Sequence, residues 1–246
     1  MTSKIESTYA EAYVWVWLPE ATQPVVAGLL SRQGQQLIFN YGRSYLARED
    51  AIALYAPELP LQPGGIPLIA GLSMPSCLRD ASPDAWGRRV LINRKLGISR
   101  ADASEIELDE LTYLLESGSD RIGALDFQMS ATQYVPRQPR QTSLEELQTA
   151  AEKVEKGVPL SPELDQALLH GTSLGGARPK VLLDDGPRKY IAKFSASNDL
   201  YSVVKAEFIA MRLARQAGLN VAGVELRTAM GKDVLVVDRL DRKSVV

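Results

Sequence analysis

Short apolar runs separated by turn residues fill the first half of the chain. Residues 12–19 (AYVWVWLP) are rich in β-branched and aromatic residues and end at a proline, which predicts a strand that is apolar on both faces. Residues 25–42 place two apolar runs around a polar, glycine-containing turn, which predicts a hairpin. Residues 56–75 contain five prolines and are predicted to be mostly loop, and residues 121–130 predict a further strand.

Four segments begin with a serine that can cap a helix and end at a glycine that favours its termination. They are residues 82–97, 104–118, 143–157 and 161–171. In two of them a glutamate follows three residues after the serine, as in a capping box: Ser104 with Glu107, and Ser143 with Glu146. In the other two a proline follows the serine directly and fits the first helical position. We therefore predict four helices.

The last third of the chain alternates between strand patterns and a helix pattern. Residues 179–196 carry two apolar runs around Asp185-Gly186, a strong hairpin signal. Residues 200–219 have helical periodicity, and residues 222–229 and 233–240 predict two strands around the turn Met-Gly-Lys. The whole pattern predicts an α+β fold with a mixed β/α part first and an antiparallel sheet with helices after it.

The 246 residues of the chain are long for one core and comfortable for two domains of roughly 100–150 residues each. Residues 132–142 are polar and proline-rich and have no apolar period, so we place a linker there. The predicted domains are therefore residues 12–131 and residues 143–246.

Composition excludes several classes of protein. The net charge of -2 offers no overall attraction for nucleic acid. The single cysteine, Cys77, excludes a disulfide framework and a thiolate metal cage. No apolar stretch approaches 18 residues and the start lacks a signal-peptide pattern, so we expect a cytoplasmic protein without membrane contact.

The stretch GTSLGGARPK at 171–180 is the most distinctive local motif. It is not a P-loop, because Ala177 follows Gly176 where that motif requires lysine. It also lacks the dinucleotide-binding pattern G-x-G-x-x-G and leads into a strand instead of a helix. What remains is a glycine-rich loop before a hairpin.

The elements after this loop follow the order found in nucleotide kinases. Glycines let backbone N–H groups approach phosphate oxygens, a strand lysine neutralises phosphate, and a glutamate on the next helix holds that lysine. Lys193 and Glu207 stand at the corresponding places. Taken alone, the pattern also fits an edge-strand lysine and a solvated helix glutamate, with the glycine pair serving only as a turn.

Several separate motifs resemble the HipA family of toxin serine/threonine kinases. They are TSLGGARPKVLL, YIAKF, KAEFIAMRLARQAGL and VLVVDRLDR in the second half, and LPLQPGG, ASPDAWGRR and DRIGAL in the first. The similarity covers roughly residues 12–242. It implies a HipA-like N-terminal domain at 12–131 and a protein-kinase-like N-lobe at 143–246.

The resemblance also implies an ATP site. Gly175 and Gly176 would contact the phosphates through their backbone, while Lys193 would bind phosphate and Glu207 would orient it. The stretch from Asp238 to Leu240 would line the adenine as a hinge.

The same loop matches the position of the family's autophosphorylation site, which falls on Ser173, with Thr172 as a weaker candidate. A phosphate at Ser173 would add about -1.5 to -2 charge where ATP phosphates are expected, and so would silence the kinase. Family members phosphorylate an aminoacyl-tRNA synthetase and are neutralised by a helix-turn-helix antitoxin that binds operator DNA. DNA would therefore be contacted only indirectly.

A kinase also needs a carboxylate that positions the substrate hydroxyl, and ligands for magnesium. No catalytic residue and no metal ligand is predicted within this chain, because the only histidine, His170, precedes the glycine-rich loop. We expect these groups and bound Mg²⁺ to belong to a missing C-lobe, so that the chain is truncated and inactive alone. The alternative is a non-catalytic interaction module that binds an antitoxin or a separate kinase lobe.

Two polar features near Trp86 have simpler interpretations. Asp84 is expected to interact with a helix dipole. The basic cluster Arg88, Arg89, Arg94 and Lys95 is expected to be a solvated or ion-paired surface.

Overall fold

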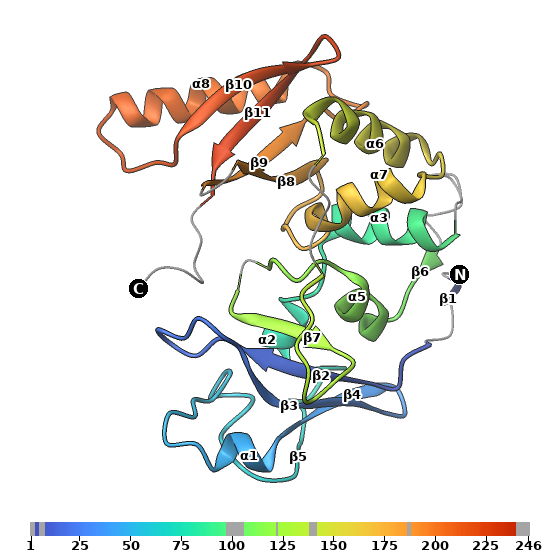
Figure 1. Cartoon of the computed structure of the whole chain (residues 1–246), viewed down its shortest axis with the longest axis vertical. Helices are drawn as coiled ribbons and strands as arrows, with labels where there is room; N and C mark the ends of the chain where they lie inside the picture. The colour runs from blue at the N-terminus through green and yellow to red at the C-terminus, as the bar shows by residue number, and fades with distance from the viewer. Residues whose placement is uncertain are drawn as a thin grey trace. The chain divides into compact units, whose positions relative to one another are not determined.

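The computed structural model of the chain describes residues 3–4, 8–96, 106–121, 123–137, 142–185 and 188–239. Four positions used in the predictions lie outside these ranges, namely Gly97, Ser104, Gly186 and Leu240. The described chain is a mixed α/β structure with antiparallel sheets (Figure 1). It also contains two short strands, β1 (Ser3–Lys4) and β6 (Ile106–Glu107).

The chain divides into two compact units. The N-unit holds the described residues within 4–83 and 108–137, and the C-unit holds Ser3 and the described residues within 84–107 and 138–241. Residues 84–107 thus belong to the C-unit, although they lie inside the first sequence-predicted domain. No helix in the described ranges is long and apolar enough to cross a membrane.

The N-unit is built on a five-stranded antiparallel sheet with the order β5-β4-β3-β2-β7. Its strands are β2 (Glu11–Val16), β3 (Val25–Gln33), β4 (Gln36–Tyr41), β5 (Gly65–Ile66) and β7 (Leu125–Gln128). The helices are α1 (Arg43–Leu46), α2 (Ser76–Arg79) and α5 (Glu110–Glu116). The predicted first strand, the hairpin, the proline-rich loop and the strand near 125 are confirmed.

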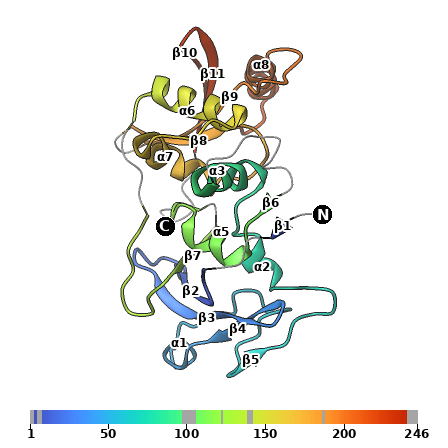
Figure 2. The ribbon, with the colours of Figure 1, turned by 90° about the vertical axis from the view of Figure 1, so that its right-hand side faces the viewer.

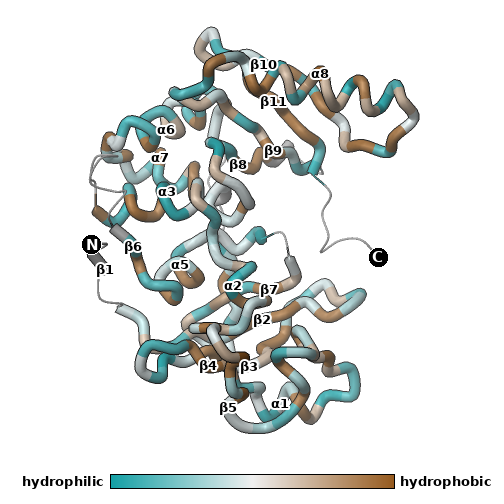
Figure 3. The backbone as a smooth tube through the Cα atoms, turned by 180° about the vertical axis from the view of Figure 1, so that it is seen from behind, coloured by the Kyte–Doolittle hydropathy of each residue, from teal (hydrophilic) through white to brown (hydrophobic). Residues whose placement is uncertain are grey.

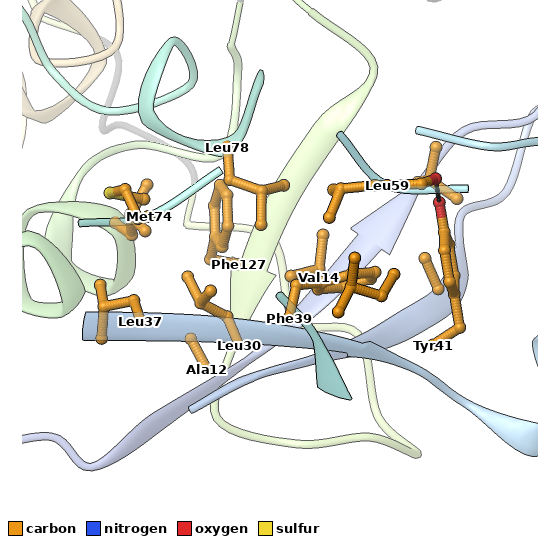
Figure 4. Close-up of a cluster of buried hydrophobic side chains, with 14 of the residues drawn as sticks. Ala12, Val14, Leu30, Leu37, Phe39, Tyr41, Leu59, Met74, Leu78 and Phe127 are labelled. Carbon is orange, nitrogen blue, oxygen red and sulfur yellow. Dashed lines mark hydrogen bonds between the residues drawn. The ribbon is translucent and has the colours of Figure 1, made fainter. Parts of the chain in front are cut away.

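Apolar side chains from four of these strands meet in the core of the N-unit (Figure 4). Val14, Leu30, Phe39 and Phe127 contribute one buried side chain each from β2, β3, β4 and β7. The Tyr41 hydroxyl is buried beside them and donates to the carbonyl of Leu59 at 2.8 Å, so its polar atom is satisfied.

The C-unit is built on a four-stranded antiparallel sheet with the order β10-β11-β9-β8. Its strands are β8 (Lys180–Asp185), β9 (Arg188–Phe194), β10 (Val224–Ala229) and β11 (Lys232–Asp238). The helices are α3 (Ala85–Leu96), α6 (Leu144–Lys156), α7 (Pro162–Leu168), the 3-10 turn η1 (Leu169–Gly171) and α8 (Val203–Gln216). Figure 2 shows α6 and α8 on opposite sides of this sheet.

The two faces of the C-unit sheet differ in chemistry. Val181, Ala192, Phe194 and Val234 alternate onto the α6 side and join its apolar core. The opposite face carries the residues between them, among them Lys193. The alternation of a strand therefore places the candidate lysine on the face toward α8.

Local capping chemistry determined two of the predicted helices. In α6, Ser143 and Glu146 form the predicted capping box, and Gly157 ends the helix at φ 67°. In α7, the Ser161 side chain accepts from the Leu164 N–H and proline takes the first position. The hairpin of β8 and β9 and the helix α8 also confirm the predicted elements.

Two predicted helix starts were wrong. The helix expected from Ser104 begins at Glu110, because the Asp109 side chain accepts from the Leu111 N–H and so caps the chain later. Glu107 lies instead in a strand. Ser82 does not start α3, because its hydroxyl donates to Glu110 at 2.8 Å and the helix begins at Ala85.

Candidate functional site

The glycine-rich loop joins η1 to β8 in the C-unit. Thr172 and Leu174 are buried and anchor it, whereas Gly175 and Gly176 are exposed at its tip. Gly176 has a φ of 100°, a conformation that favours glycine. A Cβ atom there would lie 2.7 Å from the amino nitrogen of Lys180, so a side chain at this position would force the end of that lysine to move.

Lys180 connects this loop to the strand that carries Lys193. It is the first residue of β8 and stands directly opposite Lys193 on β9. Its ammonium donates to the Gly175 carbonyl at 2.5 Å. Side chains directly opposite in an antiparallel pair have Cβ atoms about 4.5–5.5 Å apart. The two lysines and the glycine pair therefore lie close together.

The sequence-based prediction did not include Lys180, although a signal for it exists. Counting back along a hairpin from Asp185 and forward from Arg188 pairs residue 180 with residue 193. The same count would have shown two lysines side by side.

Glu207 of α8 reaches Lys193. Its carboxylate and the Lys193 ammonium form a short ion pair, with both side chains partly exposed. The helix therefore brings its glutamate to the strand lysine that was chosen from the sequence.

Positive charge exceeds negative charge around these side chains. Lys180 is only 7% exposed, and its pKa is lowered to about 8, chiefly by burial and then by the Lys193 and Arg89 charges. The Asp84 and Glu207 carboxylates raise the pKa of Lys180 and so offset part of this shift. A buried ammonium with a like charge beside it gains from any additional anion.

A further cation flanks the loop. Arg178 forms a two-pronged ion pair with Asp199, at 2.9 and 2.8 Å. The Asp199 carboxylate is the main reason that the pKa of Arg178 is raised, so this guanidinium stays charged.

The first turn of α3 holds the glycine-rich loop from the other side. The Gly176 N–H donates to the Asp84 carboxylate at 2.6 Å, and the Trp86 N–H donates to the Gly176 carbonyl at 3.2 Å. The buried Trp86 indole donates to the Lys180 carbonyl at 2.9 Å. Arg89 donates to the Ala177 carbonyl.

These contacts revise two interpretations. Asp84 precedes α3, and its side chain binds a loop amide in addition to any effect on the helix dipole. Arg89 contacts the loop and is not merely a surface charge. Arg88 and Arg94 do form ion pairs, with Glu107 and Asp165.

Asp238 lies at the end of β11, opposite Tyr190. Its N–H donates to the Gly223 carbonyl at 2.8 Å. It is three residues beyond Leu235, the cross-strand neighbour of Lys193, and so lies about 10 Å along the strand from that lysine. Leu240 lies outside the described residues.

Ser173 is partly buried in the loop between Thr172 and Leu174, two residues before the glycine pair. Within the described ranges, no group of three histidine, cysteine, aspartate or glutamate side chains comes together to hold a metal ion. Of His170, only the backbone is described. The described groups at this site are thus backbone groups of the loop, the carboxylates of Glu207, Asp199 and Asp84, and a larger number of cations, namely Lys180, Lys193, Arg89 and Arg178. Such an excess of positive charge is suited to binding an anion.

Comparison with known proteins identifies the class. The model of the HipA N-terminal domain matches residues 15–128, and that of the HipA-like C-terminal domain matches residues 172–245. The chain belongs to the HipA family.

One similar solved structure is a complex of HipA, HipB and operator DNA from a toxin–antitoxin system of Shewanella oneidensis MR-1. A chain of that complex matches with a TM-score of 0.50 at 20% identity, over 95% of this chain and 51% of that chain. This chain therefore spans about half the length of the one it matches. A search of curated proteins gave no match.

Proposed function

We propose that the C-unit is the ATP-binding part of a HipA-like serine/threonine protein kinase of a toxin–antitoxin system. The observation that carries the proposal is the chain of contacts from Gly175 through Lys180 and Lys193 to Glu207. The two ammonium groups would bind phosphate oxygens, and Glu207 would keep Lys193 in place. This arrangement supports a phosphate-binding role over a solvated edge-strand lysine, because Lys180 is buried and Lys193 is paired.

The remaining site residues extend this proposal. Backbone groups of Gly175 and Gly176 would contact the phosphates, and the stretch from Asp238 to Leu240 would line the adenine. Ser173 would be the autophosphorylation site, and a phosphate there would compete with ATP by charge.

Phosphoryl transfer needs further groups. A kinase uses a carboxylate base and ligands for Mg²⁺, and in the part of the chain that the structure describes no group of three histidine, cysteine, aspartate or glutamate side chains comes together to hold a metal ion. Since the matched chain is about twice as long, we propose that the base and the Mg²⁺ ligands come from the half that this sequence does not cover. The 246 residues would then bind ATP without transferring its phosphate.

The proposed partners follow from the family. A HipB-like helix-turn-helix antitoxin would bind the protein, and operator DNA would be contacted through it, as the composition of the similar complex suggests. The proposed substrate is a serine of an aminoacyl-tRNA synthetase.

Calorimetric titration of Mg-ATP tests the nucleotide site. Lys193→Ala should weaken binding about 10- to 100-fold, because a hydrogen bond to a charged group contributes about 1.5–3 kcal/mol. Lys232→Ala is the matched control, because Lys232 binds Glu152 of α6 on the opposite face of the sheet. Equal affinities for both variants, or no binding by the native chain, would overturn the proposal.

A second candidate is a non-catalytic interaction module, and the surface of α8 favours it. Ile209 and Leu213, one turn apart, are 56% and 58% exposed, and Leu219 follows at 62%. Figure 3 shows hydrophobic positions along this helix. Co-purification with a helix-turn-helix antitoxin that is lost in Leu213→Ser, in a chain that binds no Mg-ATP, would favour this candidate.

A further inference from the structure

Both backbone groups of Gly176 are already occupied. Its N–H donates to the Asp84 carboxylate at 2.6 Å, and its carbonyl accepts from the Trp86 N–H at 3.2 Å. The proposed function needs amides of this glycine pair for phosphate oxygens. A phosphate can take the Gly176 amide only when the Asp84 carboxylate has left it.

The surroundings of Asp84 resemble those of a bound phosphate. A carboxylate oxygen accepting from a backbone amide of a glycine-rich loop makes the same charge-assisted bond that a phosphate oxygen makes. Asp84 also acts electrostatically on Lys180, as do Lys193, Arg89 and Glu207. The carboxylate therefore lies within the field of the cations that would attract the triphosphate.

We propose that Asp84 is an internal phosphate mimic that competes with the nucleotide for the Gly176 amide and the Lys180 charge. The inference rests on the proposed nucleotide site and adds an autoinhibitory contact to it. Trp86 fixes the place of this contact, because its buried ring anchors the start of α3 while its backbone N–H holds Gly176.

A purely supporting role for Asp84 predicts the opposite sign. If the carboxylate only shaped the loop for ATP, its loss would weaken binding. If it competes, its loss strengthens binding. Asp84→Asn separates the two, because it removes the negative charge that repels the nucleotide. A neutral amide oxygen can still support the loop by accepting from the Gly176 N–H, but this bond is no longer charge-assisted and yields more easily to a phosphate.

The experiment is calorimetric titration of Mg-ATP into the native chain and into Asp84→Asn, at low and at high salt. Asp84→Asn should bind about three- to tenfold more tightly at low salt, since each charge pair at this exposure contributes up to about 1 kcal/mol and ATP carries several charges. The gain should shrink at high salt, because exposed charges are screened. Thermal unfolding of each variant confirms that it is folded.

Two controls sharpen the result. Glu225→Gln removes one exposed charge from β10, at the opposite edge of the same sheet from β8, and should leave affinity unchanged. Lys193→Ala added to Asp84→Asn should remove the gain, which shows that the tighter binding uses the same site.

The possible outcomes distinguish a failure of the Asp84 inference from a failure of the proposed nucleotide site. Tighter binding by Asp84→Asn, with no gain in Glu225→Gln or in the double variant with Lys193→Ala, supports the inference. Native binding with equal or weaker binding by the variant overturns the inference and leaves the nucleotide site in place. Absence of Mg-ATP binding by both proteins overturns the nucleotide site, and the inference with it.

Discussion

The N-unit and the C-unit each contain two cations beside a carboxylate. The carboxylate of the N-unit accepts more hydrogen bonds from its surroundings than the carboxylate of the C-unit does. In the N-unit, Asp126 is fully buried and accepts from Arg121 at 3.1 Å, Arg137 at 2.7 Å and Tyr134 at 3.0 Å. Gln128 adds a further hydrogen bond at 3.0 Å. Burial disfavours the charge of Asp126, but the two guanidinium groups outweigh it, and its pKa is lowered.

In the C-unit, the Glu207 carboxylate pairs with Lys193, whereas Lys180 reaches a neutral carbonyl, that of Gly175. Both members of the ion pair are partly exposed. The pKa of Lys180 falls to about 8, chiefly because the amine is buried and then because the Lys193 charge stands beside it.

We infer from this contrast that the N-unit cluster stabilises the fold, whereas the C-unit cluster is suited to binding an anion. Every charge in the N-unit cluster faces an opposite charge or a hydrogen-bond acceptor, so an added ion would gain little. The C-unit cluster has surplus positive charge next to an exposed glycine pair. A cation whose pKa is lowered by burial and by a like charge is a candidate for a functional site when an exposed loop lies beside it.

The largest expected effect is on stability in the N-unit. Asp126→Asn should lower the free energy of unfolding by about 3–5 kcal/mol, because it leaves buried Arg121 without its counter-charge. Denaturant unfolding measures it. Asp50→Asn, which breaks an exposed ion pair with Arg48, should change the midpoint much less. Similar losses of stability in both variants would show that the buried cluster contributes no more to stability than an exposed ion pair does.

A pair of glycines tests the geometry of the loop. Gly176→Ala and Gly34→Ala both place an alanine at positive φ, at 100° and 60°, and each should cost about 1–2 kcal/mol. Only the first introduces a Cβ close to the Lys180 amino group, since Gly34 has no atom within 4 Å of that position. Mg-ATP affinity should therefore fall in Gly176→Ala alone. Equal affinities would place the nucleotide elsewhere.

Lys180 predicts a pH dependence of nucleotide binding. With its pKa at about 8, the free protein holds this charge below pH 8 and loses it above, whereas a bound polyanion raises the pKa. Affinity should be highest below pH 8 and fall by up to about tenfold per pH unit above it. Lys180→Met should bind more weakly with a flatter profile. An unchanged profile in the variant would exclude Lys180 from the site.

The smallest effect on stability is expected for the exposed ion pair. Glu207→Gln should change the free energy of unfolding by less than about 1 kcal/mol, because water screens both partners. Mg-ATP affinity should nevertheless fall a few-fold, since Lys193 loses the group that positions it. A large loss of stability with unchanged affinity would reverse the assigned roles of the two clusters.

Sequence patterns predicted those parts of the structure that local chemistry determines. The capping box of Ser143 and Glu146, the hairpin of β8 and β9 and the helix α8 depend on residues close together in the chain. The pairing of Lys193 with Glu207 also followed from the order of elements.

Other parts depend on distant contacts that no local pattern reveals. Ser82 binds Glu110 instead of capping α3, and Asp84 reaches a loop 92 residues away in sequence. The placement of α3 in the C-unit depends on the buried ring of Trp86, which packs with α6 and the sheet. Such contacts compete with local capping and are fixed only in the folded chain.

The central claim is that Lys180 and Lys193 flank one triphosphate site. An acyl-phosphate derivative of ATP tests it directly, because a nearby lysine amine attacks the acyl carbonyl, forms an amide and releases ATP. Mass spectrometry should find the label on Lys180 and Lys193, suppressed by excess Mg-ATP, with Lys232 unlabelled. Suppressible labelling that falls on Lys232, or that avoids both site lysines, would contradict the account.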